Sequence, residues 1–144
     1  RWEKVWCEMY YDNYSYWLEM AEYDYQTAIA MLDAKRYLYV GFMLNQTIEK
    51  AFKGYYVLLK SEAPPFTHSL VKVSQKGNFY NDIPEQLKDV IDILEPLNIE
   101  ARYPSHKARL LSELDEEFCK RLLENTEVLY EWLKEKLPKK STGL

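Results

Sequence analysis

The chain has 144 residues, of which 47 % are hydrophobic, so it is long enough to fold as one domain around a buried core. Its net charge of −4 argues against broad, nonspecific binding to nucleic acids, which requires a surplus of lysine and arginine. No apolar run is long enough to cross a membrane, and the N-terminus lacks the continuous apolar stretch of a secretory signal. We therefore expect a cytoplasmic protein.

The cysteines and the aromatic residues indicate further what kind of protein this is. Cys7 and Cys119 show no spacing typical of a metal site, so we interpret them as reduced thiols and predict no metal ion or cofactor. The chain also holds 13 tyrosines and four tryptophans. We assign most of these rings to the core and its rim, and keep a base-stacking or protein interface as the alternative.

The N-terminal third predicts two helices. Apolar residues at helical spacing indicate a short amphipathic helix over residues 2–10. Asp12, Asn13 and Ser15 are candidate N-caps for a first long helix, expected at about 16–34. Its apolar stripe comprises Trp17, Met20, Ala21, Tyr25, Ala28, Met31 and Leu32.

A central helix is expected from about Tyr37 to Lys60. The short link before it predicts that the first two long helices lie antiparallel as a hairpin. Glu49 precedes Lys53 by four residues, which favours an ion pair on the helix surface. The apolar stripe of this helix comprises Leu44, Ile48, Ala51, Phe52, Tyr55, Leu58 and Leu59.

Beyond the central helix, prolines and candidate caps divide the chain. Residues 61–67 contain two prolines and form a loop. A short third helix is expected from His68 to about Gly77. Asp82 and Glu85 have the spacing of a capping box, which predicts the start of a fourth helix.

The C-terminal third is expected to hold one long helix. Pro96 ends the fourth helix, and residues 97–111 are expected to be irregular. Ser112 is the expected N-cap of a last helix, followed by acidic residues that suit the positive end of its dipole. In no segment do apolar and polar residues alternate with the two-residue period of a β-strand. We therefore predict an all-α, antiparallel up-and-down bundle of four to five helices.

Four short motifs occur in order along the chain: Ala21-x-x-Asp24-Tyr25-x-x-Ala28, Gln46-Thr47-Ile48-Glu49-Lys50-Ala51-Phe52-Lys53, Thr67-His68-Ser69-Leu70 and Ala101-Arg102-Tyr103-Pro104. Together they resemble the HEPN domain family, the higher eukaryotes and prokaryotes nucleotide-binding domain. Their order and spacing agree with the family over about residues 16–137. We therefore divide the chain into an N-terminal helical extension (1–15), a HEPN-like bundle (16–137) and a flexible tail (138–144).

The resemblance implies a helical bundle that forms a homodimer and has a role related to nucleotide or RNA. It also implies a nucleotidyltransferase partner protein, in a toxin–antitoxin or defence pair. Catalytic members of the family are metal-independent ribonucleases, with an Arg followed by four to six residues and then a His. Here three residues separate Arg102 from His106, one fewer than that motif has. We therefore expect binding, and we keep an endoribonuclease using this pair as an alternative.

Five further side chains are candidate ligand-binding residues: Glu49, Lys50, Lys53, His68 and Tyr103. Lys50 and Lys53 share a helix face that can meet phosphate, and Tyr103 can stack on a base or ribose. Two other interpretations stay open. The Glu49–Lys53 face can simply be solvated, and the chain can be a non-catalytic structural dimer or adaptor in which the polar motifs serve packing.

Overall fold

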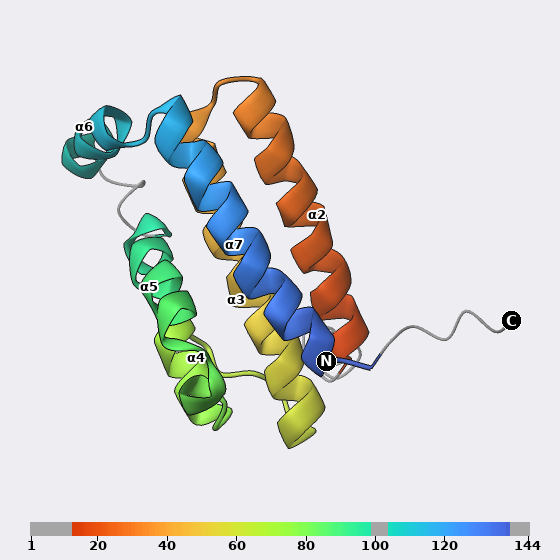
Figure 1. The fold of residues 1–144 in the computed structure, drawn as a ribbon. Helices are drawn as coiled ribbons and strands as arrows, with labels where there is room; N and C mark the ends of the chain where they lie inside the picture. The colour runs from red at the N-terminus through yellow and green to blue at the C-terminus, as the bar shows by residue number, and fades with distance from the viewer. Residues whose placement is uncertain (1–12, 99–103, 139–144) are drawn as a thin grey trace, which may run out of the picture.

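The computed structural model describes residues 13–98 and 104–138, and within these ranges it is all-α with no strand. Three long helices lie side by side: α2 (Tyr14–Asp33), α3 (Tyr37–Lys60) and α7 (Glu116–Lys136) (Figure 1). Shorter helices complete the bundle: α4 (Leu70–Lys76), α5 (Glu85–Leu94) and α6 (Pro104–Glu113). Helices α2, α3, α5 and α7 alternate in direction, which confirms the predicted up-and-down bundle (Figure 1).

The α2–α3 hairpin forms as the sequence predicts. The side chain of Asn13 accepts a hydrogen bond from the Ser15 amide at 2.9 Å and caps α2. Three residues then connect the helices, and Lys35 adopts a left-handed backbone with φ of 59°. The central helix has the predicted bounds, Tyr37 to Lys60.

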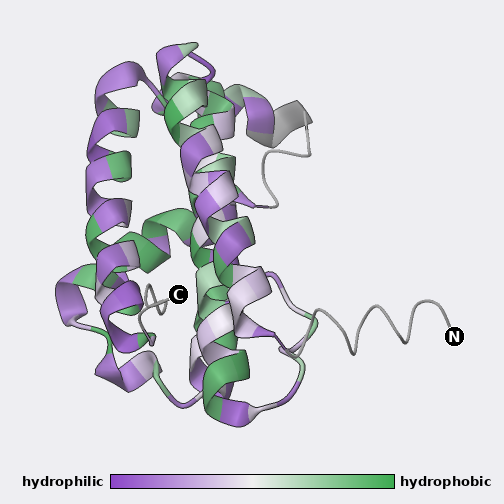
Figure 2. Cartoon of the chain, turned by 90° about the vertical axis from the view of Figure 1, so that its right-hand side faces the viewer, coloured by the Kyte–Doolittle hydropathy of each residue, from purple (hydrophilic) through white to green (hydrophobic). Residues whose placement is uncertain are grey.

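Helix α3 carries the largest part of the core. Leu44, Ile48, Ala51 and Phe52 have no exposed surface, and α3 contacts α2, α4, α5, α6 and α7. Hydrophobic residues turn inward along the long helices and hydrophilic residues turn outward (Figure 2). The predicted stripe is wrong at Leu59, which is 47 % exposed although Val57, in the same last turn of α3, is buried; Leu59 lies on the side of that turn that the bundle does not cover.

The structure corrects the predicted caps of α4 and α5. Helix α4 begins at Leu70 and is capped by Ser69, whose Oγ accepts the Lys72 amide at 3.2 Å, so His68 lies before the helix. The residue preceding α5 is Pro84, and no side chain caps that helix. Asp82 instead belongs to a 3₁₀ turn, η1 (Tyr80–Asp82), so the predicted capping box does not form.

The region after α5 is more helical than predicted. A 3₁₀ turn, η2 (Glu95–Leu97), includes Pro96, and part of the expected irregular segment is helix α6. Proline suits the first turn of a helix, which explains a start at Pro104. Ser112 lies inside α6 and donates to the Arg109 carbonyl, so it does not cap α7. Asp115 is that cap, with Oδ1 accepting the Phe118 amide at 2.8 Å.

Several predictions fall outside the described residues. These are the helix at 2–10, Cys7, and the tail beyond Pro138. Cys119 is free and fully buried, and burial raises the pKa of its thiol to about 11. Among residues 13–98 and 104–138, none of the helices combines the length and the apolar character needed to cross a lipid bilayer.

Candidate functional site

One face of α3 carries a polar stripe: Gln46, Glu49, Lys50 and Lys53 share it through the three- and four-residue spacing of a helix. Two of these side chains are nearly inaccessible, since Glu49 is 4 % and Lys53 is 8 % exposed. The stripe is therefore covered by other parts of the fold, and the solvated-face interpretation of Glu49 and Lys53 is wrong.

Lys50 joins the stripe to α2. Its Nζ forms an ion pair with the carboxylate of Asp24, which is itself buried at 5 % exposure. Asp24 lies on the inner face of α2, among the fully buried alanines Ala21 and Ala28, whose small side chains let the two helices approach closely. A buried carboxylate needs a cationic partner, and Lys50 supplies it.

Glu49 is the centre of a second group. Its Oε2 accepts from Lys53 Nζ at 3.1 Å, and its two oxygens lie 3.2 and 3.3 Å from His68 Nδ1. An ionised carboxylate only accepts hydrogen bonds, so Nδ1 carries the hydrogen and Nε2 is left to face other partners. Lys53 Nζ also lies 5.8 Å from the centroid of the Trp17 ring.

We call Asp24, Glu49, Lys50, Lys53 and His68 the charged cluster. It draws on α2, α3 and the segment 61–69, which connects α3 to α4. Two carboxylates balance two ammonium groups, so the four α2 and α3 members carry no net charge together. His68 forms the open edge, with 56 % of its side chain exposed.

Glu95 holds the segment 61–69 against the rest of the bundle. Its carboxylate accepts the amides of Leu70 and Val71 at 2.7 and 3.1 Å, at the N-terminus of α4. These are helix-start amides that no intrahelical carbonyl can reach. The position of His68 is therefore fixed on one side by Glu49 and on the other by this cap.

A polar extension links the stripe to the chain after α5. Gln46 Nε2 donates to Asn98 Oδ1 at 2.9 Å, and Asn45 Nδ2 donates to the Leu94 carbonyl at 2.7 Å. Asn98 is 1 % exposed, and its Nδ2 has no hydrogen-bond partner among the described residues. Asn98, the last described residue before 99–103, thus contacts the polar stripe of α3.

The structure unites only some of the predicted site residues. Glu49, Lys53 and His68 are in contact, and Lys50 lies beside them with Asp24. Arg102 and Tyr103 lie outside the described residues, and His106 belongs to the first turn of α6. Sequence reasoning assigned no role to Asp24, although an acidic residue beside Ala21 and Ala28 on an apolar stripe is a detectable signal.

The charged cluster contains the acidic residue of the first sequence motif and the ionisable residues of the next two. The model of the HEPN domain matches residues 14–137. The chain belongs to the HEPN domain family. The crystal structure of TT1696 from Thermus thermophilus superposes on it with a TM-score of 0.74. The two sequences are 23 % identical over 86 % of this chain and 98 % of that one, so the likeness concerns the fold. No curated protein sequence matches the chain.

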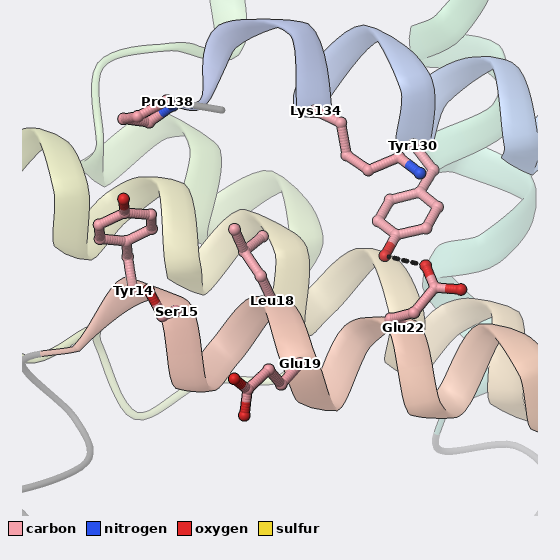
Figure 3. Close-up of a pocket in the computed structure, with 8 residues that line it drawn as sticks. All are labelled: Tyr14, Ser15, Leu18, Glu19, Glu22, Tyr130, Lys134 and Pro138. Atoms are coloured by element: carbon pink, nitrogen blue, oxygen red, sulfur yellow. Dashed lines mark hydrogen bonds between the residues drawn. The ribbon is translucent and has the colours of Figure 1, made fainter. Parts of the chain in front are cut away.

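This HEPN domain also has a groove of about 460 Å³ between α2 and α7. Figure 3 shows the Tyr130 hydroxyl donating to Glu22 Oε1, at 2.9 Å, beside Leu18. Burial, followed by the bond to Glu22, raises the pKa of Tyr130. Burial and a hydrogen bond to Glu127 raise the pKa of Tyr25, its ring neighbour, to about 12. The hydrogen bond from Tyr130 to Glu22 therefore joins a neutral donor to a carboxylate, whereas the contacts of the charged cluster are ion pairs.

No group of three or more His, Cys, Asp or Glu side chains suited to a metal ion occurs in the described part of the HEPN domain. The cluster itself offers two ammonium groups, two carboxylates and one imidazole. Such a set can bind a phosphate, a ribose hydroxyl or a base edge through charge-assisted hydrogen bonds.

Proposed function

We propose that this HEPN domain binds nucleotide or RNA, and that the phosphate groups of the ligand meet the charged cluster and Arg102. The charged cluster is the observation that carries the proposal. Five ionisable side chains from three segments meet at one place, and three of them are less than a tenth exposed.

The energy of burial supports a functional role. Removing two ion pairs from water costs free energy that their attraction repays only with good geometry, and apolar residues of similar volume would pack as well or better. A bundle that needed only packing between α2 and α3 would be served by more residues like Ala21 and Ala28, which lie in the same interface.

The charge balance indicates which residues face the ligand. Lys50 and Lys53 already have carboxylate partners, so the surplus positive charge for a phosphate has to come from elsewhere. His68 is half exposed and has Nε2 available for an outside partner. Arg102 follows Asn98 by four residues in the sequence, and the side chain of Asn98 accepts a hydrogen bond from Gln46 of the polar stripe. Its guanidinium suits a phosphate through two parallel hydrogen bonds.

The experiment measures fluorescence anisotropy of a labelled single-stranded RNA, with and without EDTA. We expect binding by the wild type, a loss of about tenfold or more in Arg102→Ala, little change in His106→Ala, and no cleavage. Arg121→Ala is the matched control, because Arg121 is an exposed arginine of α7 that pairs with Glu117 within its own helix.

Two other outcomes select the alternatives. EDTA-resistant cleavage that is lost in both Arg102→Ala and His106→Ala would identify a metal-independent ribonuclease. Neither binding nor cleavage at millimolar nucleotide would leave the non-catalytic structural dimer or adaptor, with Arg102 as a loop anchor.

We also propose the cellular setting that family membership implies. The HEPN domain acts in the cytoplasm as a homodimer, and pairs with a nucleotidyltransferase in a toxin–antitoxin or defence system. The 13 tyrosines and four tryptophans support an interface, since aromatic residues are enriched at the centres of interfaces. Sedimentation equilibrium at micromolar concentration tests the dimer, and a single species near 17.3 kDa would contradict it.

A further inference from the structure

Two lysines of α4 have no acidic partner. Lys72 and Lys76 are exposed, lie four residues apart, and form no ion pair with any described residue. Four residues rise about 6 Å along a helix, so both ammonium groups share one face of α4. Three lysines of α5 and α7 differ, because Lys88, Lys120 and Lys134 each pair with a glutamate of their own helix. Helix α4 therefore offers a positive surface in a chain whose net charge is −4.

These lysines continue the exposed edge of the charged cluster. His68 lies four residues before Lys72, so at most about 14 Å of backbone separates them. Figure 1 shows α4 at one end of the bundle, where the connection from α3 arrives. A nucleic-acid strand with one phosphate at His68 can therefore continue over Lys72 and Lys76.

A small cavity lies where α4 ends. It has a volume of about 220 Å³, and we call it the polar pocket, lined by Gln75, Asn78, Tyr80 and Asn81. Pockets that hold a whole drug-sized ligand measure about 300–1,000 Å³, so this one suits part of a ligand, such as a single base. Its three amide side chains are exposed and form no hydrogen bond with another described residue.

The backbone around the polar pocket is held in place. Asn78 adopts a left-handed conformation with φ of 63°, and its amide donates to the Gln75 carbonyl at 3.0 Å. The next amide, of Phe79, donates to the Ser74 carbonyl at 2.9 Å. The Phe79 ring is 1 % exposed and packs edge to face against Phe52 in the core. The amide side chains thus start from a preorganised turn, which lowers the entropy lost when a ligand binds.

The charged neighbours of the polar pocket do not line it. Asp82 follows Asn81 and is exposed. Burial, followed by the charge of Asp82, raises the pKa of Tyr55, so this carboxylate lies near a phenol of α3. Lys88 Nζ lies 4.6 Å from the centroid of the Tyr80 ring and covers one of its faces. The polar pocket therefore offers uncharged amide groups, with both donors and acceptors, beside a ring.

The exposed surface of residues 70–82 is polar. None of the large hydrophobic residues that are exposed in the described chain lies in this range, and Val71 and Tyr80 are only partly exposed. Protein interfaces are enriched in aromatic residues and methionine and depleted in lysine. Unpaired lysines beside free amides fit a nucleic-acid strand instead. Lysine binds phosphate, and an asparagine or glutamine amide can form two hydrogen bonds with the edge of adenine.

We propose that single-stranded RNA runs along α4 from the charged cluster, with its phosphates against Lys72 and Lys76. In the same arrangement one base enters the polar pocket, and the amides of Gln75, Asn78 and Asn81 meet its edge. This inference rests on the proposed function and names the path that the ligand follows beyond the charged cluster.

The salt dependence of binding tests the two lysines. Fluorescence anisotropy measures the binding of a labelled oligoadenylate over a range of salt concentrations, for the wild type and the double variant Lys72→Gln/Lys76→Gln. For single strands, the logarithm of the binding constant falls by about 0.7 per phosphate contact for each tenfold rise in salt. The double variant should therefore reduce this slope by about 1.4. An abasic oligomer of equal length should show the same reduction, since it carries the same phosphates.

A second double variant, Gln75→Ala/Asn81→Ala, tests the polar pocket. It should weaken oligoadenylate binding by about fivefold or more, because two amides that meet the base are lost. Binding of the abasic oligomer and both salt slopes should stay as in the wild type. Asn78 is kept, because alanine would be strained at its φ of 63°.

The matched controls lie on α7, which packs against α2, α3 and α5. Lys120→Gln removes an exposed lysine, and Asn125→Ala removes an exposed amide. Both variants should bind both oligomers with the affinity and the salt slope of the wild type. Circular dichroism checks that every variant is folded, which we expect because all the replaced side chains are exposed.

The remaining outcomes separate the two proposals. If the wild type binds oligoadenylate and both double variants bind it equally well, the path along α4 is wrong and the proposed function stands. A slope reduced as much per lysine by Lys120→Gln would also overturn the path, because only the total charge would then matter. Equal losses on both oligomers in Gln75→Ala/Asn81→Ala would show that the polar pocket takes no base. If the wild type binds neither oligomer, both proposals fail.

Discussion

The HEPN domain buries polar groups in two helix–helix interfaces, and it satisfies them differently. In the charged cluster, between α2, α3 and the segment 61–69, ammonium groups pair with carboxylates. Between α2 and α7, the neutral phenol of Tyr130 donates to the carboxylate of Glu22. A cation does contact this phenol, since Lys134 Nζ lies 4.3 Å from the centroid of the Tyr130 ring, but the Lys134 side chain is 38 % exposed. The comparison shows what distinguishes the proposed site: both interfaces bury polar groups, but only the charged cluster buries both signs of charge next to an exposed imidazole.

The largest expected loss of stability comes from a substitution in the apolar core, and it gives a reference for the losses expected at the two interfaces. Phe52 lies on an apolar face of α3 and has no exposed surface. Its ring packs edge to face against the ring of Phe79, with 5.3 Å between the ring centroids. Phe52→Ala should lower the free energy of unfolding by about 3–5 kcal/mol, because it leaves a cavity in a close-packed core. Urea unfolding measures this loss, and a value under about 1 kcal/mol would show that Phe52 is not a core residue.

The next effect concerns the charged cluster. Glu49→Ala should cost about 3 kcal/mol, because it leaves Lys53 buried without its carboxylate and releases His68. Urea unfolding at neutral pH measures the change. A loss similar to that of an exposed glutamate would mean that water reaches Lys53 freely, and it would remove the distinction between the two interfaces.

The α2–α7 interface should respond more weakly at neutral pH. Tyr130→Phe should cost about 1 kcal/mol, because Glu22 is exposed and regains water when it loses the phenol. Denaturant midpoints of the two proteins give the value. A cost as large as that of Glu49→Ala would show that the two interfaces are equally dependent on their polar groups.

The contribution of the partly buried phenol of Tyr25 to stability should depend on pH in the alkaline range. The folded pKa of Tyr25 is raised to about 12, above the value of about 10 for an unfolded tyrosine. Its contribution to stability is therefore complete below about pH 10 and is lost as the pH rises through about 12. Tyr25→Phe should make the decline in stability over this pH interval shallower than in the wild type, as followed by urea midpoints. An equally steep decline of stability with pH in both proteins would contradict the raised pKa of Tyr25.

The smallest expected effect comes from an exposed pair with the same spacing as Glu49 and Lys53. Glu117 and Arg121 lie four residues apart on α7, with 3.4 Å between Glu117 Oε1 and Arg121 Nη1. Their side chains are 82 % and 62 % exposed. Glu117→Ala should change stability by no more than about 0.5 kcal/mol in urea unfolding, because solvent screens the pair. A larger loss would show that the helix spacing, and not burial, determines the effect of Glu49→Ala.

Much of the fold follows from local patterns. The bounds of α3, the cap of α2 at Asn13 and the end of α4 at Gly77 all depend on neighbouring residues, which a sequence displays directly. The errors at Asp82 and Ser112 have one cause. Both residue types are good N-caps in isolation. In the folded chain, however, Asp82 is part of the 3₁₀ turn η1 and Ser112 is part of α6, so neither residue precedes the helix it was expected to cap. The prediction at Leu59 is wrong because periodicity does not show how far around a helix its neighbours cover it.

The candidate site was only partly predictable for the same reason. The pairing of Glu49 with Lys53 follows from a four-residue spacing, so sequence alone determined it. The pairing of Lys50 with Asp24 joins two helices, and that of His68 with Glu49 joins a turn to a helix. Spacing within a helix is a property of the backbone, whereas these contacts depend on how the helices pack. Only the tertiary structure decided that an apparently solvated face of α3 is a buried cluster of charges.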